Sequence, residues 1–491
     1  MRSIMRPGFG IVFAVTLLLG APVRARGAES PLRWEVGGTK LRLELNERIR
    51  GEFVDWFDPG PTSTTPHERY NFFASRTRIG LRIMHGDIEA FFQAQEAILA
   101  NIPKASPGPG GVYRLNTDRN LQQEPVFKQG WVSWRNAAGL KGLSLMGGRF
   151  IYSDGAEVVP TNASLAWLTR QRISERLIGP FEYTHVGRAF DGAQVAYDAG
   201  PVVVTGLATH PTAGGFEISA NRDLSEINLA GVAASAKEYS VLGGTAAGRV
   251  FWIYYADARD TAAKLDNRDA AVRDRDKDDI QVHTVGLHEL YVRPLGPGEI
   301  DGLAWVLGQV GDWGLLDHRA WAYTFELGYR FPDVPWTPWI RYGVFRSSGD
   351  DSPTDGKHDT FFQILPTARN YAQTPFYNLM NSTDLFTQLV LKPVKSVTWR
   401  TDAHWLGLTE KKDFLYSGGG ATNRDVFGYA GIPSNGRRGV AVLLDTSISF
   451  AATSWLTLYG YYGHGFGQGV IDAAFRGKQL DFGYLEATVS Y

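Results

Sequence analysis

Residues 40–53 read KLRLELNERIRGEF, and this stretch decides the fold class. Side chains alternate between the two faces of a β-strand. Polar and charged groups occupy one face here, and apolar groups occupy most of the other: Lys40, Arg42, Glu44, Asn46, Arg48, Arg50 and Glu52 against Leu41, Leu43, Leu45, Ile49 and Phe53. Such a strand suits either a sheet with one wet face or the wall of a membrane channel.

The same period of two recurs along nearly the whole chain. It is clear in NFFASRTRIGLRI (71–83), WAYTFELGYRF (321–331), SVTWRTDAHW (396–405) and LEATVSY (485–491). The spacing predicts eighteen strands, which begin near residues 39, 70, 87, 125, 142, 182, 200, 225, 247, 281, 300, 319, 336, 383, 396, 438, 454 and 479.

The length of each connection depends on whether the strand before it is even-numbered or odd-numbered. Connections after even-numbered strands are short, as at 84–87 and 393–395, whereas those after odd-numbered strands are mostly long, as at 99–124, 153–181 and 349–382. Transmembrane barrels combine short periplasmic turns with long outer loops and apolar-out alternation. The sequence therefore predicts an all-β fold: a transmembrane antiparallel up-and-down β-barrel of about 18 strands with extracellular long loops. A barrel of this size leaves an aqueous channel.

Composition and the first residues agree with this class. The 50 Lys+Arg against 51 Asp+Glu exclude a general nucleic-acid binder, and the absence of cysteine excludes disulfides and thiolate metal sites. Residues 1–27 have the basic start, short apolar run and small residues of a secretory signal peptide. We expect residues 28–491 to form a single barrel domain in the outer membrane of a Gram-negative-type cell, in contact with its lipid and lipopolysaccharide.

The first two strands place basic groups on the inward face. Arg suits carboxylates because its planar guanidinium binds them bidentately. Only Glu44 and Glu52 oppose the basic set of Lys40, Arg42, Arg48, Arg50, Arg76, Arg78 and Arg82, and further inward candidates are Arg341, Arg400 and the counter-charges Glu326, Asp402 and Asp445. Two interpretations stay open: the charges select an anionic cargo, or they only pair across the lumen.

Four segments stand out along the chain: GGRFIYSDGAEV (147–158), GRAFDGAQVAY (187–197), FRSSGDDSPTDGKHDTFFQILPTARNY (345–371) and GVAVLLDTSIS (439–449). In this order they resemble the alginate export family of outer-membrane porins. The resemblance runs from the first strand to the last. It implies an eighteen-stranded barrel whose arginine-rich lumen passes a polyuronate.

Carried over position by position, the resemblance adds pore residues. Arg149 matches the family's Gly-Arg strand, Arg188 and Asp191 match its Arg-x-Phe-Asp-Gly strand, and Asp445 matches a Glu-Leu-Asp strand in which Leu443 replaces the Glu. Arg149 and Asp191 share the parity of apolar neighbours, so we expect a bulge at Gly147–Gly148 or Gly192 to turn them inward. The turn at 450–455 is too short for the plug loop that the resemblance implies.

These observations predict a porin for passive passage of an anionic poly- or oligosaccharide such as an alginate-like polyuronate. The alternative is a general or small-anion or phosphate-selective porin with the same barrel, and a third hypothesis is a secreted β-rich carbohydrate-active protein. No HExxH, GxSxG or phosphate loop is present. We therefore expect no enzyme activity, no cofactor and no metal, and periplasmic secretion components are further candidate partners.

Overall fold

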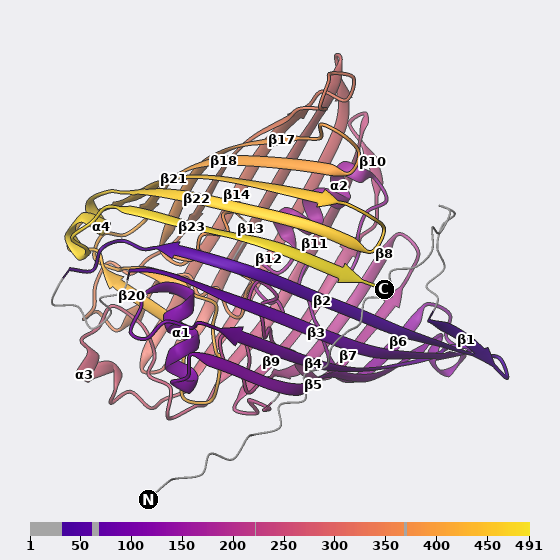
Figure 1. Cartoon of the computed structure of the whole chain (residues 1–491), viewed down its shortest axis with the longest axis horizontal. Helices are drawn as coiled ribbons and strands as arrows, with labels where there is room; N and C mark the ends of the chain where they lie inside the picture. The colour runs from indigo at the N-terminus through magenta and orange to yellow at the C-terminus, as the bar shows by residue number, and fades with distance from the viewer. Residues whose placement is uncertain (1–31, 61–67, 221, 368–370) are drawn as a thin grey trace, which may run out of the picture.

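The computed structural model describes residues 32–60, 68–220, 222–367 and 371–491. Eighteen strands form one closed antiparallel barrel (Figure 1). They are β2 (Thr39–Asp55), β3 (Arg69–His85), β4 (Ile88–Ala100), β5 (Leu121–Arg135), β6 (Leu143–Phe150), β7 (Phe190–Asp198), β8 (Val202–Pro211), β9 (Ile227–Ala236), β11 (Gly244–Asp257), β12 (Ile280–Leu295), β13 (Gly298–Trp313), β14 (Leu316–Arg330), β15 (Trp339–Ser347), β17 (Ser382–Leu391), β18 (Val397–Leu408), β21 (Gly439–Ala451), β22 (Leu456–Gly467) and β23 (Gln479–Ser490).

The remaining elements decorate this barrel. The strands β1 (Arg33–Val36), β10 (Tyr239–Val241) and β16 (Lys357–His358) extend its sheet, and β19 (Phe414–Gly418) pairs with β20 (Tyr429–Pro433) in a separate hairpin. The helices are short: α1 (Gly108–Thr117), η1 (Ala137–Gly139), α2 (Ala163–Leu168), η2 (Thr169–Ile173), α3 (Ala270–Arg273) and α4 (Gly469–Ala474). Among the residues that the structure describes, none of the helices is both long enough and apolar enough to cross a bilayer.

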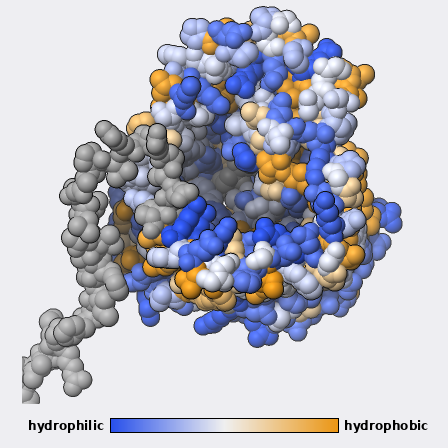
Figure 2. Space-filling view, turned by 90° about the vertical axis from the view of Figure 1, so that its right-hand side faces the viewer, coloured by the Kyte–Doolittle hydropathy of each residue, from blue (hydrophilic) through white to orange (hydrophobic). Residues whose placement is uncertain are grey.

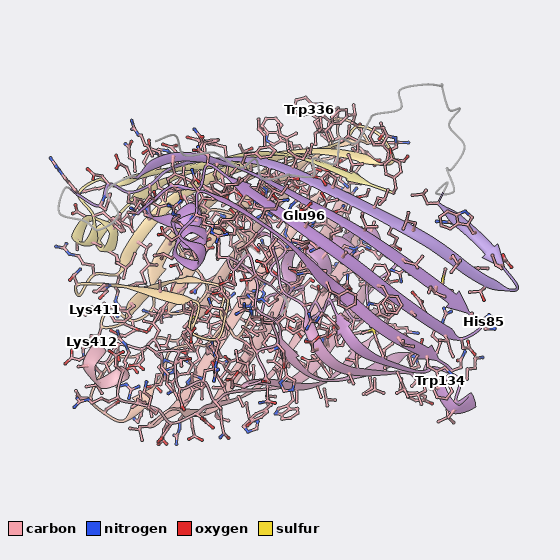
Figure 3. The ribbon with its side chains drawn as sticks, turned by 60° about the horizontal axis from the view of Figure 1, so that its bottom comes forward. His85, Glu96, Trp134, Trp336, Lys411 and Lys412 are labelled. Carbon is pink, nitrogen blue, oxygen red and sulfur yellow. The ribbon has the colours of Figure 1, made fainter. Side chains whose placement is uncertain are left out.

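The barrel closes where the first barrel strand meets the last. β2 pairs with β23 from Asn46 opposite Ser490 to Asp55 opposite Asp481. The short connections lie at one end of the barrel and most long ones at the other; His85 and Trp134 mark the short-turn end, and Lys411 and Lys412 the long-loop end (Figure 3). This arrangement confirms the strand count and the parity of the loops. The predicted signal peptide, 1–27, lies outside the described residues.

Alternation along the strands sets which side chains face the lumen. On β14, Trp321, Phe325 and Leu327 are exposed on the outer wall, whereas Thr324 and Glu326 are buried inside. Outward apolar groups suit lipid, and pairing between neighbouring strands satisfies the backbone of a closed barrel. On the first strands, Arg48, Arg50 and Arg76 of the predicted inward face are buried.

The lumen is not the open channel that the strand count suggests. The loop between β6 and β7 and the loop between β15 and β17 both fold inside the wall and pack on one another. Ile178 and Leu365 form a parallel bridge, and Gly179 donates its backbone N–H to the Leu365 carbonyl at 2.9 Å. Phe361, Phe362 and Leu365 have no exposed surface. These two inner loops narrow the channel and bring their own side chains to the wall.

The predicted start of the sixth strand is wrong, because part of the first inner loop was assigned to that strand. Every strand starts within four residues of its predicted position except the sixth, which begins at Phe190 rather than near 182. Residues 182–189 belong to the first inner loop, between β6 and β7. We call residues 181–188 the inner strap, since they lie against the arginine face of β2 and β3.

Candidate functional site

The basic face of β2 and β3 brings like charges directly opposite one another. Arg48 stands across from Arg76, and Arg42 across from Arg82. Like charges at opposed positions destabilise a sheet unless acceptors surround them. This part of the wall therefore needs negative groups in front of it, and the inner strap supplies them.

The inner strap offers the arginines carbonyl oxygens. Arg48 donates to the carbonyls of Glu182 and Thr184 at 2.7 and 2.6 Å. Arg50 donates to the carbonyl of Tyr183 at 3.0 Å. From the neighbouring strands, Gln95 and Lys128 both donate to the Val186 carbonyl. A backbone segment bound through carbonyl groups in this way presents the wall with oxygen acceptors like those of a polysaccharide.

A carboxylate completes the strap. Glu182 accepts hydrogen bonds from Arg76 at one oxygen and from Arg78 at the other, the latter at 2.7 Å. Burial alone would raise the pKa of Glu182, but Arg78 and Arg76 outweigh it and hold that pKa well below its usual range. The carboxylate is therefore charged at any physiological pH. The face that was predicted to bind acidic sugars holds an acidic group of the chain itself.

Carboxylates of the wall hold the rest of this face. Arg50 lies between Glu486 (2.7 Å) and Glu52 (3.2 Å), and its guanidinium stacks on the Tyr484 ring at 4.2 Å from the centroid. Arg82 pairs with Glu44 and Glu89, and Arg42 lies 3.6 Å from Glu44. Lys40 is exposed near the short-turn end.

Arg341 belongs to a different network, on the opposite wall. It contacts Asp301 at 3.1 Å and Glu326 at 2.9 Å, and Glu326 also binds Arg172 of η2 at 2.9 Å. All four charged groups are almost fully buried. Breaking such a buried pair costs about 3–5 kcal/mol. This network anchors the first inner loop to the wall, so Arg341 is part of a paired cluster rather than a free lining cation.

Arg400, Asp402 and Asp445 lie close together on the inner face of β18 and β21. Arg400 pairs with Asp402 and donates to the Tyr371 carbonyl of the second inner loop. Asp402 stands directly across from Asp445. The three predicted residues therefore meet in space, as their common inward parity indicates.

Arg149 and Asp191 are placed on the outer face, which corrects their assignment to the pore. The register of β6 and β7 runs without a shift from Leu143 opposite Tyr197 to Phe150 opposite Phe190, so the expected bulge is not found. The two residues stand opposite each other and form a bidentate ion pair with both distances at 2.6 Å. Pairing lowers the cost of charged groups on a wall that faces lipid.

Arg188 ends the inner strap and is not on a strand. It is 1% exposed and donates to the Gly419 carbonyl at 2.6 Å. Its guanidinium stacks on Phe181. Burial lowers the pKa of Arg188 to about 10. Arg188 therefore joins the strap to the loop that carries β19 and β20, away from the open lumen.

Sequence reasoning missed a second basic site at the short-turn end. A cavity of 290 Å³ lies between α2–η2 and the ends of β14, β15 and β17, and its lining includes Trp167, Arg170, Arg330, Trp339 and Lys392. The two indole rings lie 4.6 Å apart. Burial and the nearby Arg330 lower the pKa of Lys392. The WLTRQR motif at 167–172 was a possible signal, but a loop sequence does not indicate which way it folds.

Figure 2 shows the short-turn end, where the surface is hollowed at the centre of the barrel. Hydrophilic residues dominate the rim of this hollow.

An aromatic platform beside guanidinium and ammonium groups is suited to binding an acidic sugar ring, since the ring stacks while the cations bind its carboxylate. We call the cavity at Trp167 and Trp339 the basic vestibule.

The fold and site define an outer-membrane channel of the porin class. Solved barrels with the same fold are a BenF-like porin from Pseudomonas fluorescens Pf-5 (TM-score 0.56, 9% identity, 91% of this chain and 98% of that one) and OccK5 (OpdH) of Pseudomonas aeruginosa (TM-score 0.53, 11% identity, 91% and 98%). OccK2 (OpdF) of Pseudomonas aeruginosa, solved in complex with glucuronate, has a TM-score of 0.52 at 8% identity over 92% and 97%.

The family follows from the sequence itself. The family model described as alginate export matches residues 167–464, which is more than half of the chain. The chain belongs to the alginate export family, and the predicted outer-membrane location is confirmed. No curated protein sequence matches the chain closely enough to count as a relative.

Proposed function

We propose that this channel passes an anionic oligo- or polysaccharide of the polyuronate kind, and that Arg76 and Arg78 form its selective face. The observation that carries the proposal is the carboxylate of Glu182, bound between these two guanidinium groups. A uronate sugar carries the same chemical group. The wall is thus built to bind a carboxylate at this height of the lumen.

The strap acts as a tethered competitor of the cargo. It presents one side-chain carboxylate and several carbonyl oxygens, whereas a polyuronate presents a carboxylate on every residue. Several weak contacts at once give a polymer much higher avidity than one contact. A polymer in excess therefore displaces the Glu182 carboxylate from Arg76 and Arg78, and each individual contact stays weak enough for passage.

Three further observations support the same cargo. The chain belongs to a family described as alginate export. OccK2, a barrel of similar fold, was solved in complex with glucuronate. The basic vestibule holds aromatic and cationic groups together at the short-turn end, a combination that suits binding of a sugar acid. No direction of transport is implied, because a passive pore conducts both ways.

Inhibition of single-channel current tests the proposal. The purified barrel is placed in a planar bilayer, and chloride current is measured while oligouronates of increasing length, or neutral oligosaccharides of matched length, are added. We expect inhibition by oligouronates that strengthens with length and is weakened at least about ten-fold by Arg76→Gln combined with Arg78→Gln. The matched control exchanges two exposed arginines at the barrel ends, Arg69→Gln with Arg135→Gln, and keeps the inhibition.

The second candidate is a small-anion or phosphate-selective porin. The inward arginine face alone favours it, since guanidinium groups also bind phosphate. The same recordings separate the two functions. Equal inhibition by phosphate, monomeric uronate and oligouronate, with no effect of length, would refute the polyuronate proposal and favour this alternative.

A further inference from the structure

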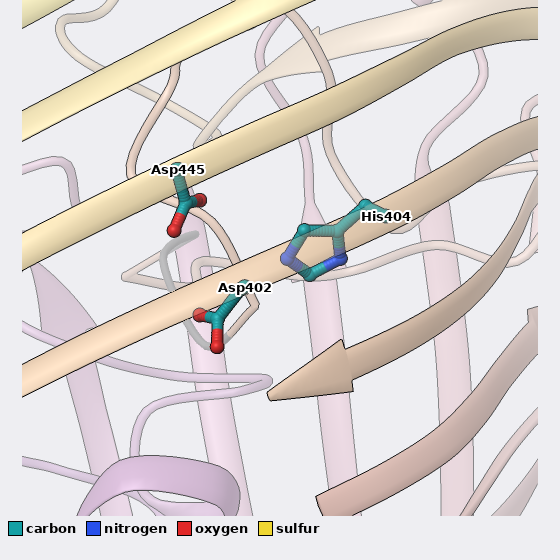
Figure 4. Close-up of side chains that lie close together, drawn as sticks. All are labelled: Asp402, His404 and Asp445. Atoms are coloured by element: carbon teal, nitrogen blue, oxygen red, sulfur yellow. The ribbon is translucent and has the colours of Figure 1, made fainter. Parts of the chain in front are cut away.

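A cluster of ligating side chains lies on the inner wall, outside the arginine face. Asp402 and His404 of β18 and Asp445 of β21 each offer one ligand atom, and these atoms lie within 4.8 Å of one another. All three side chains are at most 6% exposed. Figure 4 shows the three side chains close together, with one ring nitrogen of His404 on the side of the two carboxylates.

The cluster carries more negative charge than its neighbours neutralise. Asp402 and Asp445 are direct cross-strand partners, an arrangement that repels when both are ionised. Asp384 of β17 adds a third carboxylate behind His404, whereas Arg400 is the cation that pairs with Asp402. The acid-rich loop at 258–279 differs, because there Asp266 and Asp276 are paired with Arg268.

Two buried atoms of the cluster have no hydrogen-bond partner among the described residues. His404 uses Nδ1 toward the Asp384 carboxylate, at 2.9 and 3.1 Å, which leaves Nε2 without a partner. Arg400 occupies Oδ2 of Asp402, and Oδ1 has no partner. Buried polar atoms are nearly always satisfied, so such a pair requires an explanation.

We propose that Asp402, His404 and Asp445 bind one divalent transition-metal cation, for which Zn²⁺ is a suitable probe. The imidazole nitrogen favours Zn²⁺ and its neighbours in the first row over Mg²⁺ and Ca²⁺, which take oxygen ligands. His404 is prepared for this role, since a carboxylate that accepts from Nδ1–H fixes the tautomer with the lone pair on Nε2. Asp384 supplies that carboxylate.

The geometry requires only a small adjustment. Metal–ligand distances of about 2.0–2.2 Å place neighbouring ligand atoms roughly 3.3 Å apart, so these side chains close by on the order of 1 Å. A fourth position of the coordination sphere remains for water or for a carboxylate of the cargo. The ion joins β18 to β21 across their register and balances the excess of carboxylates. This inference does not depend on the proposed cargo.

Metal content after refolding tests the site. The barrel is refolded in detergent with ZnCl₂, passed over a desalting column with a weak chelator and measured by elemental analysis. We expect one Zn²⁺ per wild-type barrel, and little in His404→Gln or Asp445→Asn. His464→Gln is the matched control, because His464 also lies beside an aspartate, Asp481, but at a partly exposed position. It should retain the ion.

Two further measurements distinguish the outcomes. Refolding with Co²⁺ should give visible absorption bands in the wild type that His404→Gln abolishes, and Zn²⁺ should raise the melting temperature of the wild type and not of that variant. If His404→Gln fails to fold, Asp445→Asn gives the same comparison. Wild-type protein without a stoichiometric ion would overturn the proposal. It would indicate that the side chains of the cluster share a proton instead of binding a metal ion. Equal metal content in the wild type and in His404→Gln would also overturn the proposal, because it would show that the metal binds at the surface.

Discussion

The carboxylate of Glu182 lies between Arg76 and Arg78 and accepts a hydrogen bond from each. Arg78 and Glu182 are 104 residues apart in the sequence and belong to different layers of the molecule, the wall and the inner strap. This contact joins the wall of the barrel to the inner strap.

Replacing Glu182 by Gln should increase the preference for anions. The change removes one negative charge from a confined lumen, and a unit charge at this range is worth roughly 1 kcal/mol to a passing ion, or about a five-fold change in the permeability ratio. Reversal potentials in a salt gradient measure this ratio. Glu96→Gln is the matched control, because Glu96 lies on the outer set of β4 and accepts from Gln123. A variant E182Q with wild-type selectivity would contradict the assignment of this contact to the conducting path.

Arg172→Met should loosen the first inner loop. The substitution removes the buried pair of Arg172 with Glu326, at a cost of about 3–5 kcal/mol, and leaves Glu326 paired with Arg341. We expect higher and noisier single-channel conductance and faster proteolysis within 151–189, with the barrel intact by heat-modifiable gel mobility. Arg170→Met, two residues away and exposed, should leave the rate of proteolysis within 151–189 unchanged. Unaltered conductance in R172M would show that the loop does not restrict the channel.

The basic vestibule should bind uronates from one side of the membrane only. Trp167→Ala combined with Lys392→Gln removes the stacking surface and one cation; we expect a loss of about 1–3 kcal/mol, or roughly five- to 150-fold in the inhibition constant. The loss should appear when oligouronate is added at the short-turn end and not at the long-loop end. Equal loss from both sides would place the effect in the lumen instead.

The stability of the folded loops that contain Asp350 and Asp413, at the long-loop end, should depend on pH. Burial raises the pKa of Asp350 to about 7 and of Asp413 to about 6. Both pKa values lie above those of the unfolded chain, so the folded loops bind more protons, and this stabilisation is present at low pH and lost as pH rises through 6 to 7. Hydrogen exchange of residues 348–360 should accelerate from pH 5 to pH 8 beyond the intrinsic rate. Asp350→Asn should flatten this dependence, and an unchanged slope in D350N would contradict it.

The inward face of β2 and β3 was accessible to sequence reasoning because alternation is local. Once Leu41, Leu43 and Ile49 face lipid, Arg48 and Arg50 must face the lumen. The same logic placed Arg341, Arg400 and Asp402 inward. It also marked Arg149 and Asp191 as outward, and the resemblance to a family motif was the weaker guide there: the structure keeps the plain parity and pairs the two residues with each other.

The partners of these residues could not be predicted from the sequence in the same way. The boundary set at 182 made Glu182 part of a strand, whereas it lies in a loop that returns to Arg76, 106 residues earlier in the chain. Periodicity carries no information about an inward-folding loop. The pairing of Arg172 with Glu326 and the convergence of Trp167 with Trp339 depend on the same long-range packing.

The sequence by itself determined the closed eighteen-stranded barrel and the charged inner face, because a membrane wall repeats one local rule, apolar out and polar in, at every strand. Only the tertiary structure decided what that face binds at rest, how far the lumen is filled and where Asp402, His404 and Asp445 meet. Those features arise from contacts between segments distant in the chain, and they follow from how the loops pack once the barrel has closed.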